Sequence, residues 1–221
     1  MQTYTPSLLK IALFSGITAA ELPSLLNCLG VNQKKFVKNE YVFVAGQEIT
    51  HVGIVLKGQV QIVKDDIMGN RMILSECGPL DLFAESFACA HVDHAPVSVL
   101  VTEPAEIMFI DCKRIITVCP GSCPFHTKLV ENLLKVVADK NLLLNRKIEV
   151  ISQRSIRDKL LAYFYAEAQK QNSRSFRVSF NRQELADYLC ADRSALSREL
   201  SKLQAEGLVS CNGHDFELLS L

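Results

Sequence analysis

The sequence predicts an α+β protein of two domains joined by a long helix, and three patterns along its 221 residues support this. Short stretches rich in Val, Ile and Phe alternate with turn residues in the first half, and an uninterrupted helical period follows. Two short helical patterns and a hairpin end the chain. Apolar residues make up 48% and charged residues 22%, an ordinary globular composition that excludes a disordered chain.

The first half combines a small helical lead-in with a β domain. Residues 5–29 carry two helical apolar patterns, and Leu22, Leu25, Leu26 and Leu29 share one face. From Lys34 to Asp111, strand-like stretches are separated by turn residues about every eight to twelve positions, which predicts an antiparallel sandwich or barrel. The expected turns are Ala45-Gly46, Lys57-Gly58, Gly69-Asn70 and Gly78-Pro79.

A long helix follows over residues 123–151. One set of its residues recurs at alternating steps of three and four, the seam of a two-stranded coiled coil. This set, the predicted seam, is Leu134, Val137, Asn141, Leu144, Ile148 and Ile151. Asn141 fits the buried polar residue that fixes register and strand number. The pattern favours packing on a second copy, hence a homodimer, and the alternative is packing on the chain's own barrel.

The C-terminal part of the sequence predicts two capped helices followed by a hairpin. Asn181 is the expected N-cap of the first helix, with Glu184 completing a capping box. Asp192 is expected to cap the second helix, which ends at Gly207. Two helices joined by so short a turn predict helix-turn-helix geometry. Asn212-Gly213 then predicts a hairpin with a type I′ turn.

The second of these helices has a core face and a polar face. Leu196, Leu200 and Leu203 are spaced to face the core, and acidic Glu199 lies off the polar face. The polar face carries Arg193, Ser194, Ser197, Arg198, Ser201 and Ala205. Arg grips guanine bidentately in a major groove and Ser contacts phosphates or bases at short reach, so this face predicts DNA reading. The alternative is a solvated face. The chain has 24 Lys and Arg residues and 24 Asp and Glu residues, so its net charge does not support nucleic-acid binding.

The order of barrel, long helix and winged helix-turn-helix resembles the CRP/FNR family of bacterial transcription regulators over nearly the whole chain. "VAGQEITHVGIVLKGQVQIVKDDIMGNRMIL" is similar to the family's cyclic-nucleotide-type barrel, and "NRQELADYLCADRSALSREL" resembles its DNA-reading element. The resemblance implies a double-stranded β-helix (jelly-roll) effector domain over residues 1–122. It also implies a dimerisation helix over 123–151 and a winged helix-turn-helix domain over 152–221.

The resemblance also implies partners and contacts. Arg193, Ser194 and Arg198 match residues that contact bases, and Gln183 matches a phosphate contact. The implied partner is a two-fold symmetric double-stranded DNA operator bound by a homodimer, with half-sites about one helical turn apart. RNA polymerase is a further partner that the family allows. An effector in the barrel would reorient the DNA-binding domains.

The effector region departs from the family pattern. Cyclic-nucleotide-binding members use a Gly-Glu pair and, about ten residues later, an Arg-Ser pair on the cyclic phosphate. Here Glu85 matches the Glu, but Ala84 replaces the Gly and Ala95-Pro96 stand where Arg-Ser is expected. Without the Arg the charge-assisted phosphate contact is lost, so we expect a small-molecule effector other than a cyclic nucleotide. The candidate pocket residues are Glu85, Ser86, Ala95, Pro96 and Val97.

Cysteine and histidine residues offer a second kind of sensor. Iron-sulfur members of the family carry a cysteine cluster near the N-terminus, but here Cys28 is the first cysteine and stands alone. Four soft ligands, Cys112, Cys119, Cys123 and His126, could hold a metal or oxidise reversibly. Their spacing fits no standard metal pattern, and cysteine is a common buried residue, so a structural role is favoured and metal or redox sensing stays open. His91 and His94 could offer two metal ligands, but decoration of an exposed hairpin is the favoured interpretation.

Several functional classes are not expected. The N-terminus lacks a basic leader and no stretch has the length of a membrane span, which predicts a cytoplasmic protein with reduced thiols. Neither a glycine-rich phosphate loop nor an H-E-x-x-H motif occurs, so we expect no enzyme. A sensing module whose DNA binding has decayed is the remaining rival, and Arg193 with Arg198 argues against it.

Overall fold

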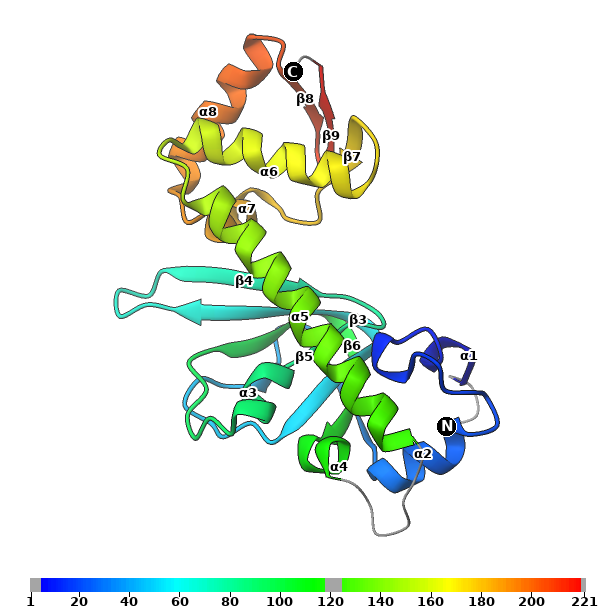
Figure 1. Ribbon diagram of the computed structural model, residues 1–221. Helices are drawn as coiled ribbons and strands as arrows, with labels where there is room; N and C mark the ends of the chain where they lie inside the picture. The colour runs from blue at the N-terminus through cyan, green and yellow to red at the C-terminus, as the bar shows by residue number, and fades with distance from the viewer. Residues whose placement is uncertain (1–4, 118–124, 220–221) are drawn as a thin grey trace. The chain divides into compact units, whose positions relative to one another are not determined.

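A computed structural model describes residues 5–117 and 125–219 (Figure 1). The chain divides into two compact units, each described by itself below. The first comprises residues 1–65 and 74–141, and the second comprises residues 66–73 and 142–221. Within the described residues, no helix combines the length and apolarity needed to cross a membrane.

The first unit begins with short helices. These are α1 (Thr5–Leu8), a 3-10 turn η2 (Ala12–Phe14) and α2 (Leu22–Leu29). The predicted apolar face of α2 is confirmed, since all four of its leucines are buried. Gly30 ends this helix with φ +58, the left-handed conformation that glycine adopts without steric cost.

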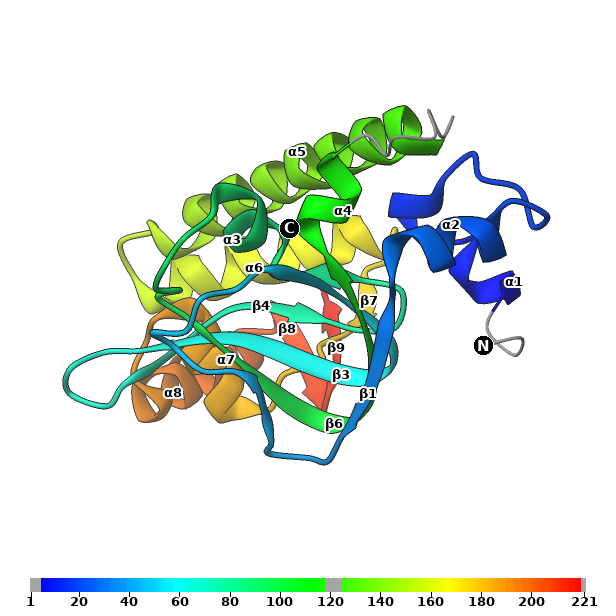
Figure 2. The same ribbon diagram turned by 90° about the horizontal axis from the view of Figure 1, so that it is seen from below.

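A six-stranded sheet forms the body of this unit. Its strands are β1 (Asn32–Phe36), β2 (Tyr41–Phe43), β3 (His51–Asp65), β4 (Arg71–Cys77), β5 (Leu82–Phe83) and β6 (Ser98–Asp111). Their order is β1-β6-β3-β4, with β2 also paired to β6 and β5 to β3. β3 and β6 are antiparallel along most of their length and run side by side in the second view (Figure 2). The prediction of an antiparallel β domain is therefore confirmed.

One predicted turn is wrong. Lys57-Gly58 does not separate two strands, because β3 continues through it and only its register with β6 shifts there. Gly58 has φ +81, and a Cβ at this position would lie 2.2 Å from the backbone oxygen of Pro104 in β6. The glycine thus marks a bulge with close backbone approach rather than a chain reversal.

Helices complete the first unit. They are α3 (Glu85–Ala90), α4 (Cys112–Ile116) and the first half of α5 (Phe125–Ile151). The Asp111 side chain caps α4 by accepting a hydrogen bond from the Lys113 backbone at 2.9 Å. Near the start of α5, Leu129 and Leu133 are buried in the core of this unit. Asn132 also fixes the helix, since its Nδ2 donates to the backbone oxygens of Leu13 and Ser15 at 2.9 and 2.8 Å.

The second unit contains three helices and a small sheet beside the end of α5. Its elements are α6 (Ile156–Lys170), β7 (Ser175–Arg177), α7 (Arg182–Leu189), α8 (Arg193–Ala205), β8 (Val209–Asn212) and β9 (Asp215–Leu218). The strands are antiparallel in the order β7-β9-β8. Aromatic rings fill the core, with the centroids of Phe164 and Phe216 4.8 Å apart and those of Phe176 and Phe216 6.1 Å apart.

The predicted C-terminal hairpin is present, but its turn is displaced by one residue. Asn212 pairs with Asp215, so the two turn residues are Gly213 and His214. Gly213 has φ +61, but His214 is not left-handed; a type I′ turn requires positive φ at both turn residues, so the type I′ prediction is wrong and the turn fits type II′. His214 lies against the segment after β7, where the distance from its Nδ1 to the Val178 carbonyl oxygen is 2.9 Å.

Candidate DNA-binding interface and effector site

Side-chain caps hold the two C-terminal helices in helix-turn-helix geometry. Asn181 Oδ1 accepts hydrogen bonds from the backbone of Gln183 and Glu184, while Glu184 Oε2 accepts one from the Asn181 backbone at 2.8 Å. Asp192 Oδ1 caps α8 by accepting from the Ala195 backbone at 2.8 Å. Both predicted caps are therefore confirmed. Three residues starting at Cys190, which is left-handed with φ +51, connect the helices.

The two faces of α8 differ in exposure. Leu196, Leu200 and Leu203 are buried, which confirms the predicted core face. Of the candidate DNA contacts, Ser197 is half-buried and the others are exposed, namely Gln183, Arg193, Ser194, Arg198 and Ser201. A helix anchored by three leucines therefore presents two arginines and small polar side chains to solvent, the composition needed for close approach to a DNA groove.

The short polar side chains of this face bond to their own elements. Ser194 Oγ donates to Asp192 Oδ1 at 2.6 Å, and Gln183 Nε2 donates to Asp187 Oδ1 at 2.8 Å. The hydrogen bond from Ser194, followed by that from the Ala195 backbone, lowers the pKa of Asp192. The carboxylate thus stays charged and keeps the start of α8 in place.

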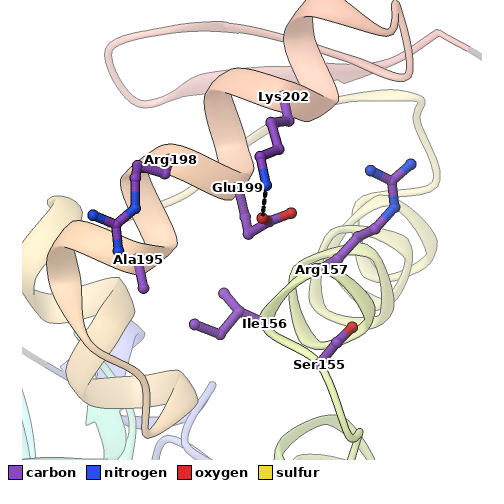
Figure 3. A pocket seen from close by; sticks show the side chains of 7 residues that line it. All are labelled: Ser155, Ile156, Arg157, Ala195, Arg198, Glu199 and Lys202. Carbon is purple, nitrogen blue, oxygen red and sulfur yellow. Dashed lines mark hydrogen bonds and ion pairs between the residues drawn. The ribbon is translucent and has the colours of Figure 1, made fainter.

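An open hollow of about 530 Å³ lies between the start of α6 and the middle of α8 (Figure 3). It is lined by Ser155, Ile156, Arg157, Ala195, Arg198, Glu199 and Lys202. Lys202 is paired with Glu199 at 2.5 Å, and Arg157 binds Glu206 through both terminal nitrogens. Among the described residues, Arg198 has neither an ion pair nor a hydrogen bond through its side chain. Its guanidinium is therefore the basic group here that is available to a ligand.

A contact that the sequence reasoning missed holds α7 to the wing formed by β8 and β9. The Arg182 guanidinium lies 5.1 Å from the centroid of the Phe216 ring, and its Nη2 is 3.2 Å from Cys211 Sγ. No local period signals this contact, because the three residues belong to different elements. It fixes the wing against the helix that carries Gln183.

In the effector region, Glu85 is paired internally. Glu85 is the first residue of α3 and is 3% exposed, and its Oε2 lies 2.8 Å from Lys140 Nζ of α5. Lys140 Nζ also donates to the Leu82 backbone oxygen at 2.5 Å. Ala84, at the position of the family's Gly, is left-handed with φ +65. Sequence reasoning singled out Glu85 but not the lysine that neutralises it.

The remaining pocket candidates differ in exposure. Ala95 and Val97 are buried, whereas Ser86 and Pro96 are exposed. The backbone of Ala95 is bonded on both sides, its nitrogen to Gln47 at 3.0 Å and its oxygen to Gly46 at 2.8 Å. Two backbone hydrogen bonds therefore hold the segment at Ala95 to the turn at Gly46 and Gln47.

The predicted cysteine–histidine cluster is not assembled by the residues that the structure describes. Cys119 and Cys123 lie outside them. Cys112 is buried with its Sγ 3.1 Å from Cys89 Sγ, a partner that the sequence reasoning missed. His126 is buried with its Nε2 3.1 Å from the Arg114 carbonyl oxygen. Nowhere in residues 5–117 and 125–219 are three or more His, Cys, Asp or Glu side chains placed to hold a metal.

His91 and His94 both follow helix α3. His91 ends α3 with φ +50, and His94 Nδ1 lies 2.9 Å from the Gly46 carbonyl oxygen. Both side chains are exposed, as expected, but they lie in the connection between α3 and β6 rather than on a hairpin, so the expected hairpin is wrong.

The predicted seam of α5 is largely uncovered in the single chain. Leu134, Leu144 and Ile148 are 71%, 49% and 57% exposed. Asn141 is exposed as well, while Val137 and Ile151 are half-buried. Within the first unit, Leu129 and Leu133 are buried in the core and Val137 of the predicted seam packs against it in part, whereas Leu134 and Asn141 remain exposed.

Comparison with known proteins agrees with this geometry. Residues 33–120 match the cyclic nucleotide-binding domain family, and residues 158–221 match the Crp-like helix-turn-helix domain family. The chain thus combines a domain of the cyclic nucleotide-binding type with a DNA-binding helix-turn-helix. It belongs to the CRP/FNR family of transcription regulators. No curated protein matches the sequence.

Solved structures share the fold at low sequence identity. The c-di-GMP responsive global regulator CLP of Xanthomonas campestris is 18% identical, with a TM-score of 0.75 over 92% of this chain and 100% of that one. FixK2 of Bradyrhizobium japonicum is 14% identical, with a TM-score of 0.67 over 86% and 93% of the two chains. CprK in complex with OCPA is 15% identical, with a TM-score of 0.70 over 90% and 91%.

Proposed function

We propose that this chain is a dimeric, sequence-specific DNA-binding regulator controlled by an effector at its N-terminal β domain. The observation that carries the proposal is α8, where a buried leucine face presents Arg193 and Arg198 outward beside an intact wing. The proposed division is an effector domain over residues 1–122, a dimerisation helix over 123–151 and a DNA-binding domain over 152–221. The proposed partners are a two-fold symmetric operator and a second copy of the chain.

The effector that we propose is not a cyclic nucleotide. Ala95-Pro96 supply no cation for a cyclic phosphate, and the buried Glu85 carboxylate already has Lys140 as its partner. A thermal-shift titration with cyclic AMP and cyclic GMP should leave the unfolding temperature unchanged. A saturable rise with either nucleotide would contradict this part of the proposal.

DNA binding is tested by fluorescence anisotropy of the purified protein on the DNA upstream of its own gene. Scrambled DNA of the same length at the same salt concentration is the reference. Tight binding to the first and weak binding to the second would support the proposal. If neither binds, selection from a random-sequence pool decides, and recovery of no preferred sequence would refute sequence-specific binding.

The role of Arg198 is tested by Arg198→Ala, with Lys202→Ala as the matched control because Lys202 lies one turn away and is paired with Glu199. Loss of a bidentate base contact should weaken specific binding by about 1–3 kcal/mol, roughly five- to 160-fold, and relax the preference at one base pair. Lys202→Ala should leave that preference unchanged. Equal losses for Arg198→Ala on specific and random DNA would instead assign Arg198 to a phosphate.

A further inference from the structure

Two thiols meet where α3 packs against α4. Cys89 lies near the end of α3 and Cys112 is the first residue of α4, and their Sγ atoms are 3.1 Å apart. Sulfur atoms in a disulfide are about 2.05 Å apart, so an approach of about 1 Å would join them. Neither residue belongs to the DNA-binding unit.

The two thiols have different environments, which suit different roles. Cys112 is 1% exposed, whereas Cys89 is half-buried, so a small oxidant from solvent meets Cys89 first. The hydrogen bond between them lowers the pKa of Cys89, and together with burial it raises the pKa of Cys112. Cys89 is thus the attacking thiol and Cys112 the thiol that resolves the product.

We propose that Cys89 and Cys112 are a peroxide-sensitive thiol pair that closes reversibly to an intramolecular disulfide. The Cys89 thiolate attacks one oxygen of hydrogen peroxide, the O–O bond breaks, and Cys89 becomes a sulfenic acid with release of hydroxide. Cys112 sulfur then attacks Cys89 sulfur, the S–O bond breaks, and a second hydroxide leaves. The two thiol protons convert both hydroxides to water, so two thiols and one peroxide give one disulfide and two waters.

The chemistry is tested on the full-length wild-type protein, without DNA. After treatment with hydrogen peroxide, protein digested under non-reducing conditions is mapped by mass spectrometry. A peptide joining Cys89 to Cys112, two hydrogen atoms lighter than its parts and separated again by dithiothreitol, is expected. A disulfide from Cys112 to Cys119 or Cys123, or Cys89 left as a thiol, would overturn the proposal.

Substitutions separate the two roles. Cys112→Ser should stop the reaction at the Cys89 sulfenic acid, which dimedone traps, and Cys89→Ser should leave Cys112 unreacted. Cys77→Ser is the matched control, because Cys77 is 4% exposed and burial raises its pKa to about 12. It should form the disulfide as the wild type does. Dimedone trapped on Cys112 rather than Cys89 would overturn the assignment, and the wild-type map stands even if a variant fails to fold.

The disulfide also has a mechanical consequence. α3 begins at Glu85, one turn before Cys89, and Glu85 is bound to Lys140 of α5. Drawing α3 toward α4 should therefore strain this ion pair. We expect oxidation to change amide hydrogen exchange in α3 and around Lys140 in the wild type but not in Cys89→Ser. Unchanged exchange around Lys140 would refute the coupling and leave the disulfide itself standing. Both readouts are independent of DNA binding, so failure of the proposed function is seen separately.

Discussion

The predicted seam makes dimerisation open to a quantitative test by Leu144→Asp. Leu144 is 49% exposed in the single chain, so about half of its side chain remains to be buried by a partner. Full burial of a leucine contributes about 1.5–3 kcal/mol, so the lost half costs about 1 kcal/mol per chain. Each carboxylate placed in the seam adds a desolvation penalty of about 1–3 kcal/mol or more. Over two chains the loss is about 4 kcal/mol at least, a thousandfold weaker dimer.

The assay is sedimentation velocity across a micromolar dilution series, with helix content followed by circular dichroism. Leu143→Asp is the matched control, because it adds the same charge to the same helix at a residue that is 58% exposed and outside the seam. Leu144→Asp should give folded monomers, and Leu143→Asp should remain dimeric. Unchanged dimers of Leu144→Asp, or equal dissociation of both variants, would refute the coiled-coil reasoning.

Three further predictions concern the second unit. Cys190 is exposed and has φ +51, a left-handed conformation that strains a residue with a Cβ but not glycine. Cys190→Gly should therefore raise the free energy of unfolding by about 0.5–1 kcal/mol in urea titration, whereas Cys190→Ala, which keeps the Cβ, should give no gain. Asp192→Ala should lower the free energy of unfolding by about 0.5–2 kcal/mol, because α8 loses its N-cap. An unchanged free energy of unfolding would show that this cap does not stabilise the domain. Burial lowers the pKa of Lys147 from 10.5 to about 8 in the folded chain. Between pH 8 and 10.5 the unfolded chain therefore binds more protons than the folded chain, so the free energy of unfolding should rise with pH, by on the order of 3 kcal/mol in total. Lys147→Met should lack this rise in urea titrations at pH 7.5 and 10.5.

Local chemistry explains which features the sequence predicted. Caps such as Asn181 and Asp192, and the left-handed Gly207, depend on residues within one turn of each other, so their signals are complete in the sequence. The leucine face of α8 is likewise set by helical period. The long helix and its seam were predictable in the same way, because the three- and four-residue spacing of apolar side chains is a property of the helix alone and does not depend on tertiary contacts.

The features that the sequence did not predict depend on tertiary contact. Gly58 has the same left-handed φ in a bulge as it would in a turn, and only the approach of Pro104 distinguishes the two. The Asn212-Gly213 signal located the hairpin, but the pairing of β8 with β9 fixed its register. Cys89 meets Cys112 only because α3 and α4 pack together, and the prediction, which grouped cysteines close in the sequence, therefore did not include Cys89.

The Glu85–Lys140 ion pair connects the departure from the family's ligand pattern with the dimer helix. A buried carboxylate must be neutralised, and where a bound ligand is absent from that role an internal cation is needed. Lys140 provides this cation, with its Nζ 2.8 Å from Glu85 Oε2. Lys140 belongs to α5, the helix that also carries Val137 and Leu144 of the seam. Any event that displaces α3, whether a ligand or the Cys89–Cys112 disulfide, therefore acts directly on the helix proposed to join the two copies. The β domain would need no further element between α3 and α5 to reach the proposed dimer interface.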